Sequence, residues 1–317
     1  MPSTDNITIL KGGSLNSTCL HENSMGKFVR KKIATDKNRE YGYVRWYSQL
    51  KKLQRYNSMF PGFVPKVLDA GVNDNEAYFD IEYIDGIDIK TLFKNNLIDD
   101  VEKLNQSLWE AFDLIHHRSY SPLRSSLMLY FMEEVEQKLH DALEFPEFRD
   151  FYMMDVYEYR GETFRGMIGQ HDKFKKLFNR DITSEGYVHG NPTLENILYN
   201  TDTNKITFID LYEEGIVDSR YSDYSQVLQC SNSHYGLIND SIVTINDNQI
   251  MSDYIIPDKL AEFNSLFIEN IEDNTSLVML FEATQYFRML PFKCHSSNIS
   301  HAKFFYGYGC YLVNKLL

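Results

Sequence analysis

The sequence predicts an α+β fold in which a small antiparallel β-sheet precedes a larger and mostly helical part. Between residues 7 and 84, short apolar runs alternate with turn residues, a pattern typical of strands. From Ile89 onwards, apolar residues recur every three or four positions, which indicates amphipathic helices. The length of 317 residues suffices for one large core or two lobes. We therefore expect one domain over residues 1–86 and another over residues 87–317.

Composition and charge restrict the classes of partner. The chain is 43% hydrophobic and 24% charged, as in globular proteins, and its net charge of −13 arises from 45 acidic and 32 basic residues. Such a charge argues against binding to nucleic acid, whose phosphates would be repelled. It favours a cationic or amine-bearing substrate, unless it serves only solubility.

The four cysteines are scattered and form no C-x-x-C pair, so neither a disulfide framework nor a zinc site is expected. This usage suits a reducing compartment, and we expect a cytoplasmic protein. The first residues lack the basic and apolar regions of a secretory signal, and no stretch has the length and apolarity of a membrane span.

The N-terminal region predicts three strands, over residues 7–11, 18–20 and 27–33, with a glycine-rich turn after the first. Gly12, Gly13 and Ser14 form this turn. Paired glycines let a backbone approach a phosphate closely, and serine can add a hydrogen bond. The same residues also suit an ordinary hairpin turn, and no Gly-Lys-Ser/Thr follows that would make a Walker loop.

The third strand contains two adjacent lysines, of which we choose Lys31 as the phosphate-binding residue. Side chains of a strand alternate between its faces, so Lys31 shares a face with Val29, whereas Lys32 shares one with Arg30. A lysine that binds phosphate is expected beside a small apolar residue that covers the base. The alternative is that both lysines form a solvated basic strand end.

A helix over residues 36–56 follows, in which Trp46, Leu50 and Leu53 recur at helical spacing. Glu40 lies inside this helix, and Asp36 precedes it as a helix cap. Two further strands are predicted over residues 64–71 and 76–84.

The remainder predicts a helix over residues 101–117 that ends in a His-His pair, for which a core or capping role outweighs metal binding. Asp223 is expected to cap a short helix over residues 224–230. Further amphipathic segments cover residues 126–143, 149–159, 171–180, 257–271, 275–289 and 302–316.

A polar loop and a predicted β-hairpin over residues 188–211 contain the candidate chemistry. His189 and Asn191 precede Asn196, and a second strand ends on Asp210. Phosphoryl transfer needs this layout, because the asparagine and the last aspartate can hold Mg²⁺ while the earlier position faces the substrate hydroxyl. The other interpretation is a polar loop between two unrelated strands.

This segment resembles the catalytic and metal loops of the aminoglycoside phosphotransferase and choline kinase superfamily, the small-molecule branch of the protein-kinase-like fold. The family pattern H-G-D-x-x-x-x-N agrees in spacing with residues 189–196, and its I-D strand end agrees with Ile209 and Asp210. Asn191 stands where the family has its catalytic aspartate, and an amide cannot accept a proton at neutral pH. Residues 281–292 are similar, more loosely, to kinase-like proteins of bacterial capsule and lipopolysaccharide pathways.

The resemblance implies a two-lobed fold, ATP and Mg²⁺ as cofactors, and a small-molecule hydroxyl acceptor such as a sugar, an amino alcohol or an aminoglycoside. It also implies roles for individual residues: Gly12, Gly13 and Ser14 at the phosphates; Lys31, held by Glu40, at the α and β phosphates; main-chain atoms of Glu82 and Ile84 at the adenine; Asn196 and Asp210 as metal ligands; and His189 and Asn191 in the catalytic loop.

Three interpretations of Asn191 follow. The chain is a small-molecule kinase whose activity the asparagine reduces, because phosphoryl transfer depends mainly on positioning and charge. It is alternatively a nucleotide-binding pseudokinase that acts as a sensor or scaffold. The third interpretation is a kinase impaired by an Asp-to-Asn change, whether natural or engineered.

Overall fold

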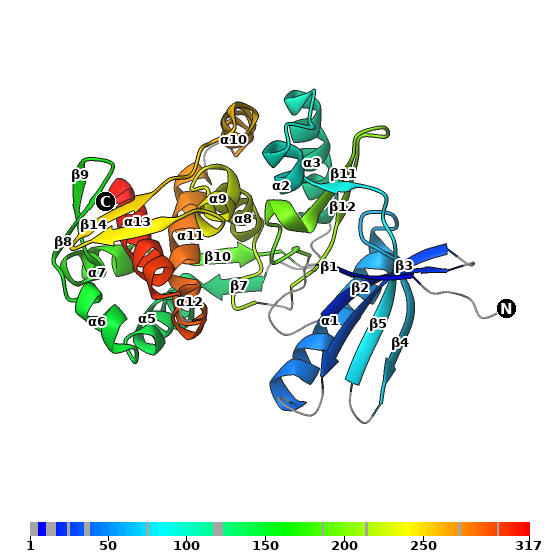
Figure 1. The fold of residues 1–317 in the computed structure, drawn as a ribbon, viewed down its shortest axis with the longest axis horizontal. Helices are drawn as coiled ribbons and strands as arrows, with labels where there is room; N and C mark the ends of the chain where they lie inside the picture. Colours follow the sequence, from blue (N-terminus) through cyan, green and yellow to red (C-terminus); the bar gives the residue numbers. More distant parts are fainter. Residues whose placement is uncertain are drawn as a thin grey trace. The chain divides into compact units, whose positions relative to one another are not determined.

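The structure is a computed structural model, and it describes residues 6–10, 17–23, 26–34, 39–73, 76–116, 123–185, 187–212, 215–271, 274–296 and 298–317. The expected α+β composition is confirmed, with an antiparallel sheet near the N-terminus and a helical C-terminal part (Figure 1). The chain divides into two compact units. Unit 1 comprises residues 1–92, 106–115 and 189–215, and unit 2 comprises residues 93–105, 116–188 and 216–317. The sequence predicts a single boundary after residue 86, whereas these units are discontinuous.

Unit 1 contains a five-stranded antiparallel sheet in the order β1-β2-β3-β5-β4. Its strands are β1 (Asn6–Leu10), β2 (Ser17–Asn23), β3 (Gly26–Ala34), β4 (Val67–Val72) and β5 (Glu76–Glu82). In the centre, Lys31 of β3 lies opposite Thr18 of β2 and Phe79 of β5. This register fixes which β3 side chains share a face with the buried residues of β5.

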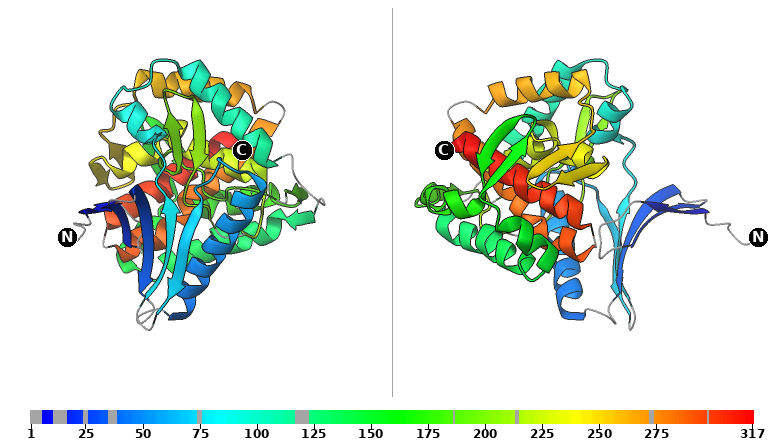
Figure 2. Two further views of the ribbon diagram at one scale, coloured as in Figure 1. Left: turned by 90° about the vertical axis from the view of Figure 1, so that its right-hand side faces the viewer. Right: turned by 60° about the vertical axis from the view of Figure 1, so that its left-hand side comes forward.

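Helix α1 (Arg39–Met59) lies beside this sheet (Figure 2). Its residues Trp46, Leu50 and Leu53 are buried, as their spacing predicts. A Cβ added at Gly42 would lie 2.8 Å from the Cδ1 atom of Ile33 on β3. The glycine therefore permits a close approach between helix and strand.

A second, three-stranded sheet of unit 1 has the order β12-β11-β6. It consists of β6 (Ile87–Asp88), β11 (Ile197–Asn200) and β12 (Lys205–Phe208), and β11 and β12 form the predicted hairpin. On one face, the side chains of Ile197, Tyr199, Ile206 and Phe208 are all buried. The opposite face of the hairpin carries Leu198, Asn200, Lys205 and Thr207, as the alternation of strand side chains requires.

Helices α2 (Ile89–Lys94) and α3 (Val101–His116) contain residues of both units. The helices of unit 2 are α4 (Leu127–Phe131), α5 (Gln137–Ala142), α6 (Pro146–Tyr152), α7 (Met167–Lys176), α8 (Arg220–Ser231), α9 (Tyr235–Asn239), α10 (Asp258–Glu269), α11 (Thr275–Arg288), α12 (Leu290–His295) and α13 (Ile299–Leu316). A π-helical turn, η1 (Met132–Glu136), joins α4 to α5.

Unit 2 also contains strands, some of which contradict the sequence prediction. β7 (Leu123–Ser126) pairs with β10 (Asp181–Ser184), and a four-stranded sheet has the order β13-β14-β8-β9. The members of that sheet are β8 (Val156–Tyr159), β9 (Glu162–Arg165), β13 (Val243–Asn246) and β14 (Gln249–Ser252).

The helical interpretation of residues 149–159 is therefore wrong in its second half. Arg160 and Gly161 both have positive φ angles, of 52° and 80°. Such a two-residue turn matches the twist of a hairpin, so it turns β8 back into β9. The β-branched and aromatic residues of β8 suit a strand, which overrides their helical spacing.

Asp223 also differs from its predicted role as a helix cap. It lies inside α8, where Ser219 is the N-cap and accepts a hydrogen bond from the Tyr221 amide. The Asp223 carboxylate is instead buried beside His116, with 3.0 Å between Oδ2 and Nε2. The acid is buried as expected, and one of its partners is the side chain of His116.

The core of unit 2 is rich in aromatic residues. Tyr157, Tyr286, Tyr306, Phe148 and Phe281 belong to one cluster of fully buried side chains. All four cysteines are free thiols, and none of them forms a disulfide. Across the described residues, no helix combines the length and apolarity that a membrane span requires.

Candidate active site

His189 connects the two loops that contain the predicted site residues. It is fully buried, and its Nε2 lies 3.0 Å from the carbonyl oxygen of Ile209. Its Nδ1 accepts a hydrogen bond of 3.1 Å from the backbone amide of Asn191. An imidazole that accepts at Nδ1 must donate at Nε2, so this pair of contacts defines a neutral tautomer. The ring therefore ties the residue before Asp210 to Asn191.

Gly190 makes this geometry accessible to the backbone. Its φ angle is +86°, in a region that residues with a Cβ rarely adopt. The glycine turns the chain so that the amide of Asn191 reaches back to the ring of His189. Glycine after His189 is therefore explained by the backbone turn that brings the Asn191 amide to the imidazole ring.

Asn191 and Asn196 are linked through the main chain. The Nδ2 atom of Asn196 donates to the carbonyl oxygen of Asn191 over 2.9 Å. Thr193 donates its backbone amide to the same oxygen, which closes the loop into a tight turn. Among the described residues, no hydrogen bond engages the Asn191 side-chain amide or the Oδ1 atom of Asn196. Both groups are available to a ligand.

The hairpin places Ile209 opposite Asn196, and Asp210 follows one residue later. Ile197 pairs with Phe208, and the Ile209 amide donates to the Asn196 carbonyl oxygen over 2.9 Å, one step beyond the strands. Asp210 follows with a φ angle of 55°, a left-handed conformation that aspartate tolerates better than most residues. The two predicted metal ligands therefore emerge at the same end of the hairpin.

Lys31 of β3 forms an ion pair with the Oδ1 atom of Asp210. The lysine side chain is 14% exposed and the aspartate side chain 33%. Burial of the Asp210 carboxyl favours its neutral form, but the charge of Lys31 and its hydrogen bond outweigh this effect and hold the pKa of Asp210 below its usual value. The carboxylate is thus ionised at neutral pH and can receive a cation.

The two lysines of β3 lie on opposite faces of the sheet. Lys31 lies opposite Phe79, which is buried on the same face as Ile33. Lys32 lies on the other face, where its Nζ is 3.3 Å from the carboxylate of Glu76. The structure places Lys31 on the face of Val29, and it brings this lysine alone to Asp210.

Several predicted residues lie outside the described part of the structure. These are Gly12, Gly13 and Ser14, together with the side chain of Glu40, whose backbone belongs to α1. The predicted pairing of Lys31 with Glu40 therefore stays a prediction. The ion pair that the structure describes for Lys31 is with Asp210.

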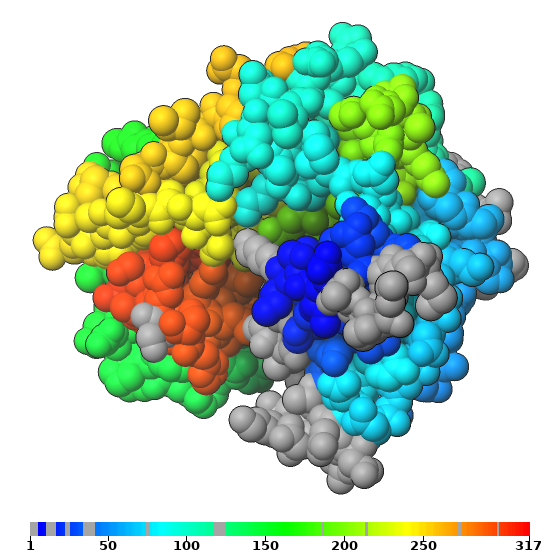
Figure 3. Space-filling model, turned by 45° about the vertical axis from the view of Figure 1, so that its right-hand side comes forward, coloured from blue at the N-terminus to red at the C-terminus, as the bar shows by residue number. Residues whose placement is uncertain are grey.

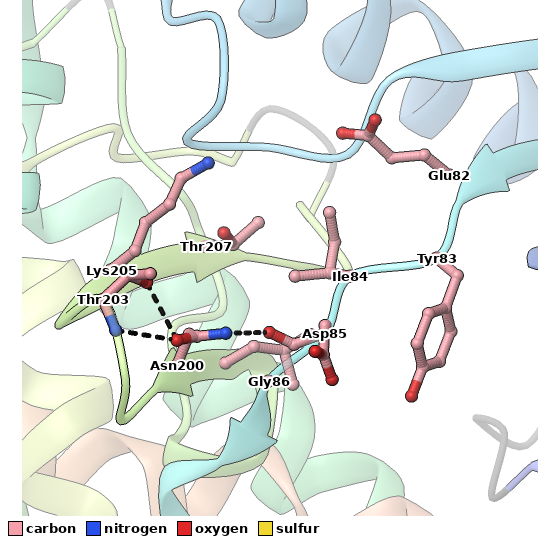
Figure 4. A pocket seen from close by; sticks show the side chains of 10 residues that line it. Glu82, Tyr83, Ile84, Asp85, Gly86, Asn200, Thr203, Lys205 and Thr207 are labelled. Atoms are coloured by element: carbon pink, nitrogen blue, oxygen red, sulfur yellow. Dashed lines mark hydrogen bonds between the residues drawn. The ribbon is translucent and has the colours of Figure 1, made fainter.

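The predicted adenine-binding segment, residues 82–86, begins at the last residue of β5 and leads to β6 without regular secondary structure. It lines a pocket of about 260 Å³ together with one face of the β11–β12 hairpin. Figure 4 shows Ile84 pointing toward the hairpin and Asn200 bonded to the Asp85 carbonyl oxygen, over 2.8 Å. The hairpin turn lies at the surface, in yellow-green in Figure 3.

This pocket lies toward the turn of the hairpin, whereas Asn196 and Asp210 lie at its other end. Among the residues of β12 that line the pocket, Thr207 is nearest to Asp210 in the sequence, three residues before it, a separation of at most roughly 10 Å at the usual rise of a strand. The predicted base-binding segment and the predicted metal ligands thus meet the same hairpin at different points along its length.

Two residues of α1 that the sequence did not single out contact this site. The Nζ atom of Lys52 donates to the carbonyl oxygen of His189 over 3.2 Å, and the guanidinium of Arg45 stacks 5.0 Å from the ring of Tyr212. In the sequence, Arg45 and Lys52 belong to a set of polar residues at helical spacing, beside the apolar residues of the same helix. It is hard to recognise because Lys51 and Lys52 together look like a solvated face.

The donor set suits Mg²⁺ better than a softer metal. The described residues hold no group of three or more His, Cys, Asp or Glu side chains that could bind a metal ion. Asn196 and Asp210 offer one amide oxygen and one carboxylate. Mg²⁺ typically takes only one or two protein ligands and completes its shell with water and substrate phosphates, so these residues fit it.

Comparison with known proteins adds no assignment. No protein-family model matches the chain, and a search of curated proteins finds no significant match.

Proposed function

We propose that the protein is an ATP-dependent phosphotransferase that moves the γ-phosphoryl group to a hydroxyl of a small metabolite. The observation that carries the proposal is the ion pair between Lys31 and Asp210, at the hairpin end where Asn196 also emerges. A cation paired with a carboxylate, and an amide oxygen at the same end of the hairpin, are groups that Mg·ATP requires. The resemblance of residues 189–210 to the aminoglycoside phosphotransferase superfamily supports the same function.

In this proposal some of the residues bind the nucleotide, and Asn191 contacts the acceptor. Lys31 binds the α and β phosphates, and Asn196 and Asp210 hold Mg²⁺, which neutralises the phosphate charge when it is bound. Main-chain atoms of Glu82 and Ile84 contact the adenine. Phosphoryl transfer has a loose transition state, so binding and orientation account for most of the catalysis.

Asn191 orients the acceptor hydroxyl. Its amide has no hydrogen-bond partner among the described residues, and it can accept a hydrogen bond from a hydroxyl or donate one to it. It cannot take the proton, so the hydroxyl must lose its proton to solvent or to the phosphate as the new bond forms. General base catalysis contributes typically ~10²–10⁴-fold, which sets the size of the expected loss.

The acceptor is a small hydroxylated molecule, and an amine-bearing one suits the charge best. The chain carries a net charge of −13, which attracts cations over distances of about a Debye length. Sugars, amino alcohols and aminoglycosides are the classes to test first.

One observation favours a second function, that of a nucleotide-binding pseudokinase. Asn191 replaces the group that would accept the hydroxyl proton. A protein that only senses nucleotide would retain Lys31 and Asp210 and would have no use for a base at position 191. The two functions differ in phosphoryl transfer and agree in nucleotide binding.

An assay for transfer of a labelled γ-phosphoryl group to a panel of sugars, amino alcohols and aminoglycosides distinguishes the phosphotransferase from the pseudokinase. The measurement uses the wild type and the Asn191→Asp variant, after both have been shown to bind Mg·ATP. An enzyme should label an acceptor slowly, and Asn191→Asp should raise kcat and kcat/KM together by at least roughly tenfold. If both proteins bind Mg·ATP and neither labels any acceptor, the pseudokinase replaces the enzyme.

A further inference from the structure

Helix α1 buries a polar side as well as an apolar one. Arg45, Gln49, Lys52 and Tyr56 recur at intervals of four, three and four residues, which places them along one side of the helix. Lys52 is only 4% exposed, and Gln49 only 8%. Lysine is almost never buried unless its ammonium group has a partner. The burial of Lys52 therefore requires partners for its ammonium group, and the His189 carbonyl oxygen is one of them.

The ammonium of Lys52 reaches the point where the two loops of the candidate site meet. The His189 carbonyl oxygen accepts its hydrogen bond over 3.2 Å and also accepts the backbone amide of Tyr212 over 3.1 Å. Tyr212 lies two residues after Asp210, and Arg45 covers its ring. Thus α1 contacts both the loop that begins at His189 and the loop that follows Asp210.

His189 transmits this contact to the predicted site residues. Its carbonyl oxygen is held by Lys52 and Tyr212, while its ring bonds the amide of Asn191 and the carbonyl oxygen of Ile209. A charged donor makes a stronger hydrogen bond than a neutral one, roughly twice as strong. Lys52 therefore fixes the residue from which both loops take their position.

We propose that Lys52 is a positioning residue for phosphoryl transfer, which holds Asn191 and Asp210 in register by anchoring the His189 carbonyl oxygen to α1. This inference rests on the proposed function. It predicts that Lys52 affects the rate of transfer more than the affinity for Mg·ATP, because Asp210 keeps its carboxylate beside Lys31, where it can still bind Mg²⁺, whereas the rate is sensitive to small displacements. A misplacement of about 1 Å at a reacting group can cost on the order of 10²-fold in rate.

The test compares Lys52→Met with Lys52→Arg and with Lys51→Met. Methionine keeps an unbranched stem and removes the charge, and arginine retains the charge. Lys51 is an exposed neighbour whose Nζ stacks 5.3 Å from the ring of Tyr47, so its variant controls for the loss of one positive charge on α1. Thermal unfolding establishes that each variant is folded, and if Lys52→Met is not, Lys52→Gln takes its place.

Two readouts are needed. Hydrogen–deuterium exchange of peptides within residues 187–212 reports the order of the loops without any ligand. Hydrolysis of Mg·ATP reports phosphoryl transfer with water as acceptor, so it needs no knowledge of the natural substrate. We expect Lys52→Met to exchange faster in this segment alone and to lose at least roughly tenfold in kcat, with KM for Mg·ATP changed by less than about threefold. Lys52→Arg should recover part of the exchange protection and part of kcat, and Lys51→Met should match the wild type in both readouts.

The possible results separate this inference from the proposed function. If the wild type neither binds nor hydrolyses Mg·ATP, the proposed function fails, and exchange alone decides whether Lys52 orders the loops. If the wild type is active and Lys52→Met has wild-type exchange or wild-type kcat, the positioning function of Lys52 is overturned. An equal loss in Lys51→Met would also overturn it, because the effect would then be one of charge in general.

Discussion

Lys31 and Asp210 are separated by 179 positions in the sequence and form an ion pair. The strand β3 provides the lysine, and the end of the β11–β12 hairpin provides the aspartate. Without a ligand, each charge satisfies the other. In the proposed function the phosphates bind the lysine and Mg²⁺ binds the carboxylate, so nucleotide binding exchanges one ion pair for two.

The first prediction concerns the two lysines of β3. Lys31→Ala should weaken Mg·ATP binding about ten- to a hundredfold, because a hydrogen bond to a charged group contributes about 1.5–3 kcal/mol. Lys32→Ala removes the same charge from the opposite face and should change the affinity by less than about twofold. Calorimetric titration of both variants checks this. A larger loss in Lys32→Ala would show that the wrong lysine has been chosen.

The second prediction concerns Gly190. An alanine at a φ angle of +86° is strained, so Gly190→Ala should lower the free energy of unfolding by about 1–2 kcal/mol. It should also weaken Mg·ATP binding, because the strained turn displaces the Asn191 carbonyl oxygen, to which the predicted metal ligand Asn196 donates a hydrogen bond. Gly161→Ala is the matched control, since Gly161 has a φ angle of 80° and open space around its Cα. It should show a similar loss of stability and wild-type binding.

Urea unfolding and calorimetry measure the two effects separately. Equal binding by Gly190→Ala and the wild type would mean that the turn at Gly190 does not set the geometry of the site.

The third prediction is a dependence of stability on pH through Glu282. Burial raises the pKa of Glu282 to about 7 from its usual value of 4.5, although Ser233 and Asn232 donate hydrogen bonds that oppose the shift. The folded protein thus binds this proton more tightly than the unfolded chain. Its stabilising contribution is fully present below pH 4.5 and is lost as the pH rises to about 7, by about 3 kcal/mol.

Glu282→Gln keeps the acceptor for Asn232 and removes the ionisation. The variant should therefore gain stability relative to the wild type between pH 4.5 and 7, and the gain should be constant above pH 7. Urea unfolding across this range measures it, with Glu262→Gln as an exposed control on α10. A constant difference between wild type and variant over the whole range would contradict a raised pKa.

Local rules of the sequence place Lys31 on its face of β3 and Asp210 at the end of the hairpin, whereas the roles of both residues come from the resemblance and stay predictions. Alternation along β3 separates the faces of Lys31 and Lys32, and the spacing of the hairpin places Asp210 after its second strand. Trp46, Leu50 and Leu53 are buried as their spacing predicts. In each case, neighbours in sequence determine the environment.

Other features depend on tertiary contacts that a periodicity does not contain. Val156–Tyr159 has helical spacing but forms a strand, because the turn at Arg160 and Gly161 pairs it with β9 and β14 also joins it. Lys52 lies next to an exposed lysine and is nevertheless buried against His189. The partner of Asp223 is His116, 107 positions away. The sequence alone therefore predicts the loops of the candidate site better than the residues that support them.

In the proposed function Asp210 holds the metal of a nucleotide complex, and calorimetry of the Asp210→Asn variant tests this role most directly. The wild type and the variant are titrated with ATP, with and without Mg²⁺, and with adenosine. We expect Mg²⁺ to strengthen ATP binding to the wild type, the variant to lose this dependence on Mg²⁺, and both proteins to bind adenosine equally. Retention of the Mg²⁺ dependence by the variant, or an equal loss of affinity for ATP and adenosine, would contradict the assignment of Asp210.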